Sequence, residues 1–281
     1  MKLKIKKENL VSPVLKYTRT KSGWGLRANH EEHKLIFSGV FTPQILKSQS
    51  VGNETGVIDI YTLFSDSAKQ AWKNAYLSAR SRKSEVGLED IFIALLQEKS
   101  VKNLLLRLNA STHAAEVLIK NYLTLTHSTT DNSVKIIPFE SFLLSVKLHN
   151  HKIGSLMLLG ALLKSVPNDT ILQAIFSNIG LTLDKLELFA VWQLRLNYQF
   201  PANSSNFKYL YCCQQTEMLE QHFGYFFDLP AIELAVILSA NKTLKDLEHK
   251  RALQLLVKAA SLAKNKQTKI IGENLVTEAS K

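Results

Sequence analysis

Residues 86–96 read VGLEDIFIALL, and residues 153–163, 67 positions later, read IGSLMLLGALL. Each stretch begins with a β-branched residue and a glycine, and continues as an apolar run that ends in Ala-Leu-Leu. An offset of 67 residues is too long for one turn of a solenoid, but it suits a small helical unit that occurs twice. Because one such unit buries its apolar face poorly alone, the repeat predicts two helical units that share a core.

The sequence around both stretches is typical of further helices. Ser65 and Asp66 can cap a helix whose apolar positions recur every three or four residues from Ala68 onward. Asn109 and Gly180 each follow the third expected helix of their unit, where a left-handed helix end favours glycine or asparagine. We expect four helices in each unit, at 66–79, 88–97, 101–108 and 114–125 in the first and at 139–148, 155–163, 170–178 and 183–194 in the second.

The two ends of the chain have different patterns. Short β-prone pieces at 34–40 and 56–63 predict an irregular or weakly stranded N-terminal extension. The C-terminal part predicts helices at 209–223, 230–239 and 247–264 and a short fourth at 272–279. We therefore expect a mainly α protein in three parts. These are the extension 1–63, a double-repeat domain 64–198 with units 64–126 and 134–198, and a small helical domain 207–281.

Charge is concentrated at both ends of the chain. The net charge is +11, and residues 1–40 carry nine Lys or Arg against three acids, while residues 241–281 carry nine against four. Such basic ends can hold nucleic acid or an acidic partner surface, or they can simply keep the helices soluble. No aromatic-interleaved RNA motif, Cys/His finger or Arg-rich run occurs in the sequence, so nucleic acid is not an expected partner.

The remaining composition indicates a compartment. Two adjacent cysteines, Cys212 and Cys213, fit a reduced intracellular protein better than a disulfide framework or a zinc site. The basic start of the chain, residues 1–7, is followed by no apolar run, and the most apolar segment, 153–163, is too short to span a bilayer. The sequence therefore predicts a soluble protein of the cytoplasm or of a plastid stroma, with no membrane partner.

The repeated motifs resemble a known family. VGLEDIFIALL is similar to the second-helix signature of the Clp N-terminal repeat, which is close to I-G-T-E-H-L-L-L-A-L-L, and Phe64-Ser65-Asp66-Ser67-Ala68 resembles its F-T-x-x-A start. In the second unit, residues 153–163 and Asn178-Ile179-Gly180-Leu181 are similar to the same signature and to the L-G-V turn before helix four. The resemblance implies one all-helical domain of two pseudo-twofold repeats, which in Clp unfoldases precedes the ATPase rings and receives adaptors and substrates.

The C-terminal part resembles the small helical lid of the first Clp ATPase ring. Residues 219–224, 231–239 and 251–260 match its pieces in order and spacing, with His249-Lys250-Arg251 where the family has P-D-K. The G-x-x-x-x-G-K-[ST] loop that cradles nucleotide phosphates is missing from the sequence. Only about a dozen residues lie where the large ATPase subdomain should be. The resemblance therefore implies a protein that is not an enzyme and needs no cofactor.

The resemblance also supplies candidate binding residues. In some family members the acid of I-G-T-E-H helps to bind phosphorylated arginine, and Glu89 occupies that position here, whereas Leu156 replaces it in the second unit. We take Glu89 and its neighbour Asp90 as candidate partner-binding residues, although Glu89 can also serve only the positive end of its helix. Arg251, within the altered lid motif, is the third candidate.

Other clusters are better explained by structure than by chemistry. His30 and His33 have no evident further metal ligand, and His149-Asn150-His151 lies at an expected helix end, where histidines commonly interact with the helix dipole. Neither a catalytic nor a metal-binding residue is expected. The tail also holds aromatic residues that form either its core or a partner-facing patch, namely Tyr209, Tyr211, Phe223, Tyr225, Phe226 and Phe227.

The sequence thus supports two functional hypotheses. The first is a non-catalytic protein-binding module that acts as an adaptor, decoy or regulator of a Clp unfoldase–protease, with a Clp ATPase or its substrates and adaptors as partners. The alternative is a scaffold or partner-binding module of another assembly, such as a secretion or nucleoprotein complex, unrelated to proteolysis. In that case the basic ends and residues 1–60 carry the specificity.

Overall fold

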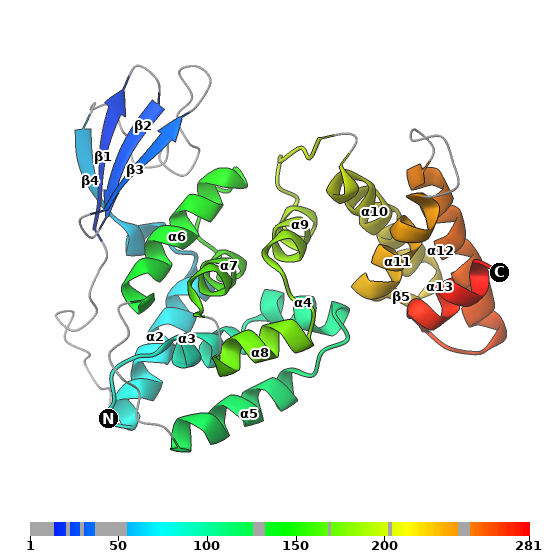
Figure 1. Cartoon of the computed structure of the whole chain (residues 1–281), viewed down its shortest axis with the longest axis horizontal. Coiled ribbons are helices and arrows are strands. Elements are labelled where there is room, and N and C mark those ends of the chain that lie inside the picture. Colours follow the sequence, from blue (N-terminus) through cyan, green and yellow to red (C-terminus); the bar gives the residue numbers. More distant parts are fainter. Residues whose placement is uncertain are drawn as a thin grey trace. The chain divides into compact units, whose positions relative to one another are not determined.

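The computed structural model describes residues 14–20, 23–28, 31–36, 55–125, 133–167, 170–201, 204–240 and 248–281. In these ranges the chain is mainly α-helical, with twelve α-helices, as the sequence predicts (Figure 1). Packing divides the chain into two compact units. The first lies within Met1–Lys102 and His113–Ser177, and the second within Asn103–Thr112 and Asn178–Lys281. This division cuts through the segment 64–198 that the sequence analysis treats as one domain.

The N-terminal part forms a regular sheet, which corrects the expectation of an irregular or weakly stranded extension. Its strand order is β3-β2-β1-β4, and every neighbouring pair is antiparallel (Figure 1). The strands are β1 (Val14–Thr20), β2 (Gly23–Ala28), β3 (Glu31–Ile36) and β4 (Thr55–Asp59). β4 lies largely within the β-prone piece 56–63 and β3 overlaps 34–40 by three residues, but β1 and β2 were not expected. β2 contains two glycines, which are poor strand formers alone, so pairing on both sides decides its conformation.

The helices of the first compact unit follow the predicted order. They are the short 3₁₀ helix η2 (Ile60–Leu63), α2 (Asp66–Ser81), α3 (Leu88–Leu95), the start of α4 (Lys99–Arg107), α5 (Thr112–Leu125), α6 (Ser133–Lys147), α7 (Ser155–Ser165) and α8 (Ile171–Asn178). Most bounds lie within three residues of those expected. α6 is the exception, because it begins six residues earlier than predicted and carries Pro138 in its interior. Proline is tolerated in the first turn of a helix and disfavoured in its interior, and Pro138 is the sixth residue of α6.

Local chemistry fixes where these helices begin and end. The Ser65 hydroxyl accepts a hydrogen bond from the Ala68 backbone N–H at 3.2 Å and so caps α2 as expected. Asn109 and Gly180 have φ angles of 56° and 62°, so both adopt the predicted left-handed conformation. Lys83 and His149 close α2 and α6 with almost the same φ, 57° and 55°.

The two repeated stretches pack into one core. Phe64, just before α2, forms a parallel β-bridge with Ile153, just before α7. The Ser65 N–H donates to the Ile153 carbonyl at 2.9 Å, and the Ile153 N–H donates to the Leu63 carbonyl at 2.9 Å. α3 packs against α7, and the rings of Phe92 and Phe176 meet edge to face with centroids 5.1 Å apart. Both repeated stretches therefore lie in one compact unit and contribute buried side chains to its core, whereas α9 and the end of α4 belong to the other unit.

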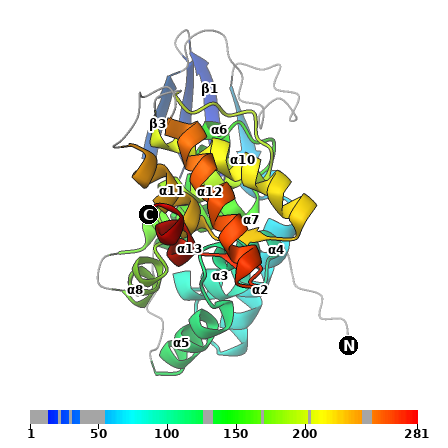
Figure 2. The same cartoon turned by 90° about the vertical axis from the view of Figure 1, so that its right-hand side faces the viewer.

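The second compact unit contains the C-terminal helices. They are the end of α4, α9 (Leu183–Gln193), α10 (Ser205–Phe223), α11 (Leu229–Ala240), α12 (Glu248–Asn265) and α13 (Glu273–Ala279). α11, α12 and α13 pack against one another (Figure 2). Two short parallel strands, β5 (Phe226–Phe227) and β6 (Ile270–Ile271), join the end of α10 to the start of α13.

α9 is tied to this second unit by polar contacts. The Trp192 indole N–H donates to Glu217 on α10 at 3.1 Å, and Lys185 pairs with Glu233 on α11 at 2.9 Å. The core beneath them is apolar and includes Phe227, Ile232, Leu256 and Ile271, all fully buried. Among the described residues, no helix combines the length and the apolar character that crossing a bilayer requires.

Candidate functional site

Asp90 is a buried helix cap. Its side chain is fully buried, and Oδ2 accepts a hydrogen bond from the Gly87 N–H at 3.1 Å. Its Oδ1 accepts from Arg82 Nη2 at 2.7 Å, and Arg82 also donates to the Ser78 hydroxyl at 2.9 Å. Asp90 therefore joins the end of α2 to the start of α3, and its carboxylate is fully engaged inside the fold.

Glu89 and its counterpart in the second repeat have different surroundings. Glu89 is the second residue of α3 and half-buried, so its carboxylate lies in the first turn, where the helix dipole favours a negative charge. Gly154 caps α7 with nearly the same backbone angles as Gly87, with ψ of 173° at both. There the matching residues are Leu156 and Met157, which are buried at 1% and 0% exposure. The described repeats therefore contain one acidic helix start and one apolar one.

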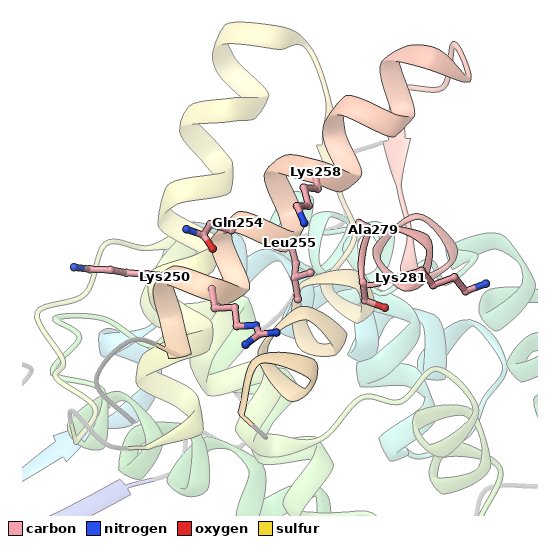
Figure 3. A pocket seen from close by; sticks show the side chains of 8 residues that line it. Lys250, Gln254, Leu255, Lys258, Ala279 and Lys281 are labelled. Atoms are coloured by element: carbon pink, nitrogen blue, oxygen red, sulfur yellow. The ribbon is translucent and has the colours of Figure 1, made fainter. Parts of the chain in front are cut away.

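Arg251 lies in the other compact unit, at a basic hollow between α12 and α13 (Figure 3). The hollow has a volume of about 440 Å³. We call it the α12–α13 hollow, and its lining residues are Lys250, Arg251, Gln254, Leu255, Lys258, Ala279, Ser280 and Lys281. Four of these eight side chains are cationic and none is acidic.

The three lysines of the α12–α13 hollow have no carboxylate partner among the described residues. Within the described residues, no carboxylate side chain lies within ion-pair distance of Lys250, Lys258 or Lys281. Glu248, the acid in the first turn of α12, is 5% exposed and pairs instead with Lys208 on α10. Lys250 also lies near the positive end of the α12 dipole, where a cation costs about 0.3–1 kcal/mol. Folding stability therefore gives no reason for this concentration of positive charge.

A second hollow, of about 280 Å³, surrounds a buried arginine that the sequence analysis did not single out. Arg107, in the last turn of α4, donates two hydrogen bonds to Glu220 on α10, at 2.6 and 2.7 Å. It donates a third to the Phe227 carbonyl at 3.0 Å, and its guanidinium lies 4.7 Å from the Trp192 ring centroid and 4.4 Å from that of Phe226. The partners lie up to 120 positions away in the sequence, so no local signal reveals this cluster.

The Arg107 cluster is structural in character. Its charges are balanced, because Glu220 pairs with Arg107 and the neighbouring Glu217 pairs with Arg195 at 2.6 Å. Among the described buried side chains, Arg107 Nε is the one polar atom without a hydrogen-bond partner, and it adjoins the ring faces rather than a second acceptor. Cation–π contacts with both rings partly compensate for this.

The two cysteines are buried thiols. Burial raises the pKa of the Cys212 thiol to about 12 and raises the pKa of Cys213 well above its ordinary value. Both therefore stay protonated near neutral pH, which removes them as nucleophiles and as thiolate ligands. In the described part of the chain, no group of three or more His, Cys, Asp or Glu side chains is placed to hold a metal ion. His30 lies outside the described residues, and His149 closes α6.

The aromatic residues of the tail divide between core and surface. Tyr209 is buried and donates its hydroxyl to the Leu229 carbonyl at 2.9 Å, and burial raises its pKa well above the usual value. Phe227 is fully buried. Phe223, at the end of α10, is 67% exposed and lies 6.5 Å from the Tyr225 ring. Two of the six residues, Tyr209 and Phe227, thus belong to the core, Tyr211, Tyr225 and Phe226 are half-buried, and Phe223 lies on the surface.

Comparison with known proteins gives no family assignment. The sequence matches no protein-family model, and no curated protein sequence is significantly similar to it.

Proposed function

We propose that this chain is a non-catalytic protein-binding relative of the Clp unfoldases that acts as an adaptor or regulator of a Clp unfoldase–protease. One observation carries the proposal: the same series of four helices occurs twice in order, from α2 to α5 and from α6 to α9. The second helix of each series is capped by a glycine in the same extended conformation, and the third is closed by a left-handed residue. These are the features expected of tandem Clp N-type repeats related by a pseudo-twofold axis.

The tail supports the same proposal less directly. α10, α11, α12 and α13 follow one another at the spacing of the lid pieces to which residues 219–224, 231–239 and 251–260 are similar. In this proposal the lid-like tail docks against a Clp ring by imitating a subunit, while the repeats hold an adaptor or a substrate. The chain lacks the phosphate-binding loop G-x-x-x-x-G-K-[ST], so the nucleotide chemistry belongs to the partner. Such a role places the protein in the cytoplasm or a plastid stroma.

The proposal is tested with purified Clp unfoldase from the same organism, assembled in the presence of ATP. We expect the chain to bind the unfoldase with micromolar or tighter affinity and to change the rate at which the unfoldase–protease degrades a fluorescent substrate. The chain alone is expected to hydrolyse no ATP. The proposal fails if neither binding nor a change in degradation is seen at saturating concentrations. Recovery of a secretion or nucleoprotein complex in place of Clp components, in affinity purification from the native host, favours the alternative function.

A second part of the same test asks which unit carries the interaction. Unfoldase particles with and without their own N-terminal domains are compared as binding partners. Binding that survives removal of those domains indicates contact with the ATPase ring, as expected for a lid-like tail. Binding that requires the N-terminal domains indicates that the chain contacts those domains, where it competes with or recruits adaptors and substrates.

A further inference from the structure

We propose that the α12–α13 hollow binds a short acidic segment of a partner protein. The inference rests on the proposed function only in taking the partner to be a protein. The hollow combines four cationic side chains with the amide of Gln254 and the hydroxyl of Ser280, and Leu255 adds an apolar surface. Carboxylates accept hydrogen bonds from all of these polar groups, and lysine and arginine bind them with charge assistance.

The arrangement of the cations favours an extended ligand over a single small anion. Figure 3 shows Lys250 and Lys281 pointing away from each other, with Leu255 between them. Lys250, Gln254 and Lys258 follow one another at four-residue intervals and therefore lie along one face of α12. Because the lysine ammonium groups point in different directions, they cannot all bind one phosphate group. They suit several negative charges spaced along a polypeptide that crosses the hollow.

The surroundings favour a protein segment over a nucleic acid. None of the described residues that line the hollow is aromatic, so they offer bases no stacking surface. The basic surface is also short, because α13 exposes the acids Glu273 and Glu278 beyond it. Glu278 already pairs with Lys266 at 2.6 Å. A continuous phosphate backbone that extended past the hollow would meet these carboxylates, whereas a segment of a few acidic residues would not.

The helix dipole strengthens the same preference. Lys250 and Arg251 lie in the first turn of α12, so an anion held by them also interacts with the positive end of that helix. Glu248 does not compete for this position, since it is buried against Lys208. A bound carboxylate therefore offsets the unfavourable position of the Lys250 cation in the first turn of α12.

The test measures binding of a fluorescein-labelled twelve-residue peptide, four repeats of Glu-Asp-Ser, to the full chain by fluorescence anisotropy at low ionic strength. We expect saturable binding that weakens steeply with added salt. The double variant Lys250→Glu with Lys258→Glu is expected to bind the peptide about tenfold or more weakly, since both substitutions place a negative charge in the hollow, where it repels the acidic peptide. The variant should fold, because both side chains are exposed and glutamate suits the start of α12.

A matched control separates the hollow from the overall charge of the chain. Lys264→Glu with Lys269→Glu makes the same change in net charge at exposed residues that do not line the hollow. We expect it to weaken peptide binding less than twofold. Equal losses in both double variants would overturn the proposal, as would absence of peptide binding by the native chain. Tighter binding of a twenty-nucleotide single-stranded DNA than of the peptide, abolished by the same hollow variant, would also overturn it.

This experiment contains no Clp component, so it can fail independently of the proposed function. Peptide binding at the hollow without any Clp interaction refutes the proposed function alone. A Clp interaction that the hollow variant leaves unchanged, together with absent peptide binding, refutes the inference alone.

Discussion

Replacing Glu220 by glutamine should destabilise the second compact unit far more than the same replacement three residues earlier in α10. Arg107 and Glu220 are 10% and 12% exposed in their side chains, and Glu220 Oε1 also accepts the Phe227 N–H at 2.9 Å. Glutamine keeps one acceptor oxygen and the shape of the side chain, but it leaves the Arg107 charge buried without a counter-ion. Breaking a buried pair in this way costs about 3–5 kcal/mol.

The matched control is Glu217→Gln, whose partner Arg195 is 60% exposed. Glutamine can still accept the Trp192 N–H there, so the expected loss is at most about 1 kcal/mol. Urea unfolding is followed by the fluorescence of the three tryptophans, Trp24, Trp72 and Trp192, with circular dichroism as a second probe. With an m value of about 2 kcal/mol/M, Glu220→Gln lowers the midpoint by about 2 M, and the control by about 0.5 M or less.

A Glu220→Gln midpoint within about 0.5 M of the control would refute this reasoning, because it would mean that solvent already screens the pair. The size of the loss also tests the role of the two rings. If the cation–π contacts with Trp192 and Phe226 stabilise the Arg107 charge even without Glu220, Arg107→Met will lower the free energy of unfolding more than Glu220→Gln does. A double-mutant cycle between the two positions gives the coupling energy directly.

Three further predictions use other parts of the fold. Burial raises the pKa of Asp228, so ionising it opposes folding: its unfavourable contribution is absent below the unfolded pKa and grows as pH rises towards the folded one. Asp228→Asn keeps a side-chain oxygen that accepts the Ala231 N–H, 2.8 Å away in the native chain. The variant should therefore remove the loss of stability that ionisation of Asp228 causes, measured as the difference in unfolding free energy between pH 3.5 and 6. Cys212 and Cys213 should react with a thiol reagent at pH 8 only after denaturation, and rapid labelling of the native chain would contradict their burial. Gly180→Ala should lower stability by about 1 kcal/mol at its φ of 62°, whereas Asn109→Gly, at 56°, should cost nothing measurable in the same urea assay.

Helices of this chain could be predicted because their signals are local. Ser65, Gly87 and Gly180 each act within one turn of the helix they begin or end, and the sequence displays those neighbours directly. The capping role of Asp90 could also be predicted, since Asp90 lies three residues after the capping Gly87 and accepts its N–H. Asp90 was predicted, with Glu89, to bind a partner, because the local pattern does not reveal the ion pair with Arg82 or the burial of the Asp90 side chain.

Two features could not be predicted because they depend on distant partners. The N-terminal sheet depends on pairing, as in the register of Tyr17 with both Leu26 and Gly56, and the two glycines of β2 give that strand weak propensity of its own. Arg107 has the ordinary appearance of a cation at a helix end, and only the fold brings Glu220, Trp192 and Phe226 around it. In both cases the information lies in contacts between residues far apart in the chain.

The two repeats differ in a way that bears on how a partner is held. In the first, α3 begins with the half-buried Glu89 and with Asp90, whose carboxylate accepts from Gly87 and Arg82, and in the second the same two positions are the buried Leu156 and Met157. The two repeats therefore do not form a pair of equivalent acidic pockets. In the described part of the chain, the exposed lysines Lys250, Lys258 and Lys281, which have no ion-pair partner there, gather instead at the α12–α13 hollow, and Lys250 lies in the first turn of α12, where a cation is unfavourable for folding. If partner recognition has moved from the repeats to the tail, charge reversal at Lys250 and Lys258 will reduce partner binding while removal of Glu89 leaves it unchanged.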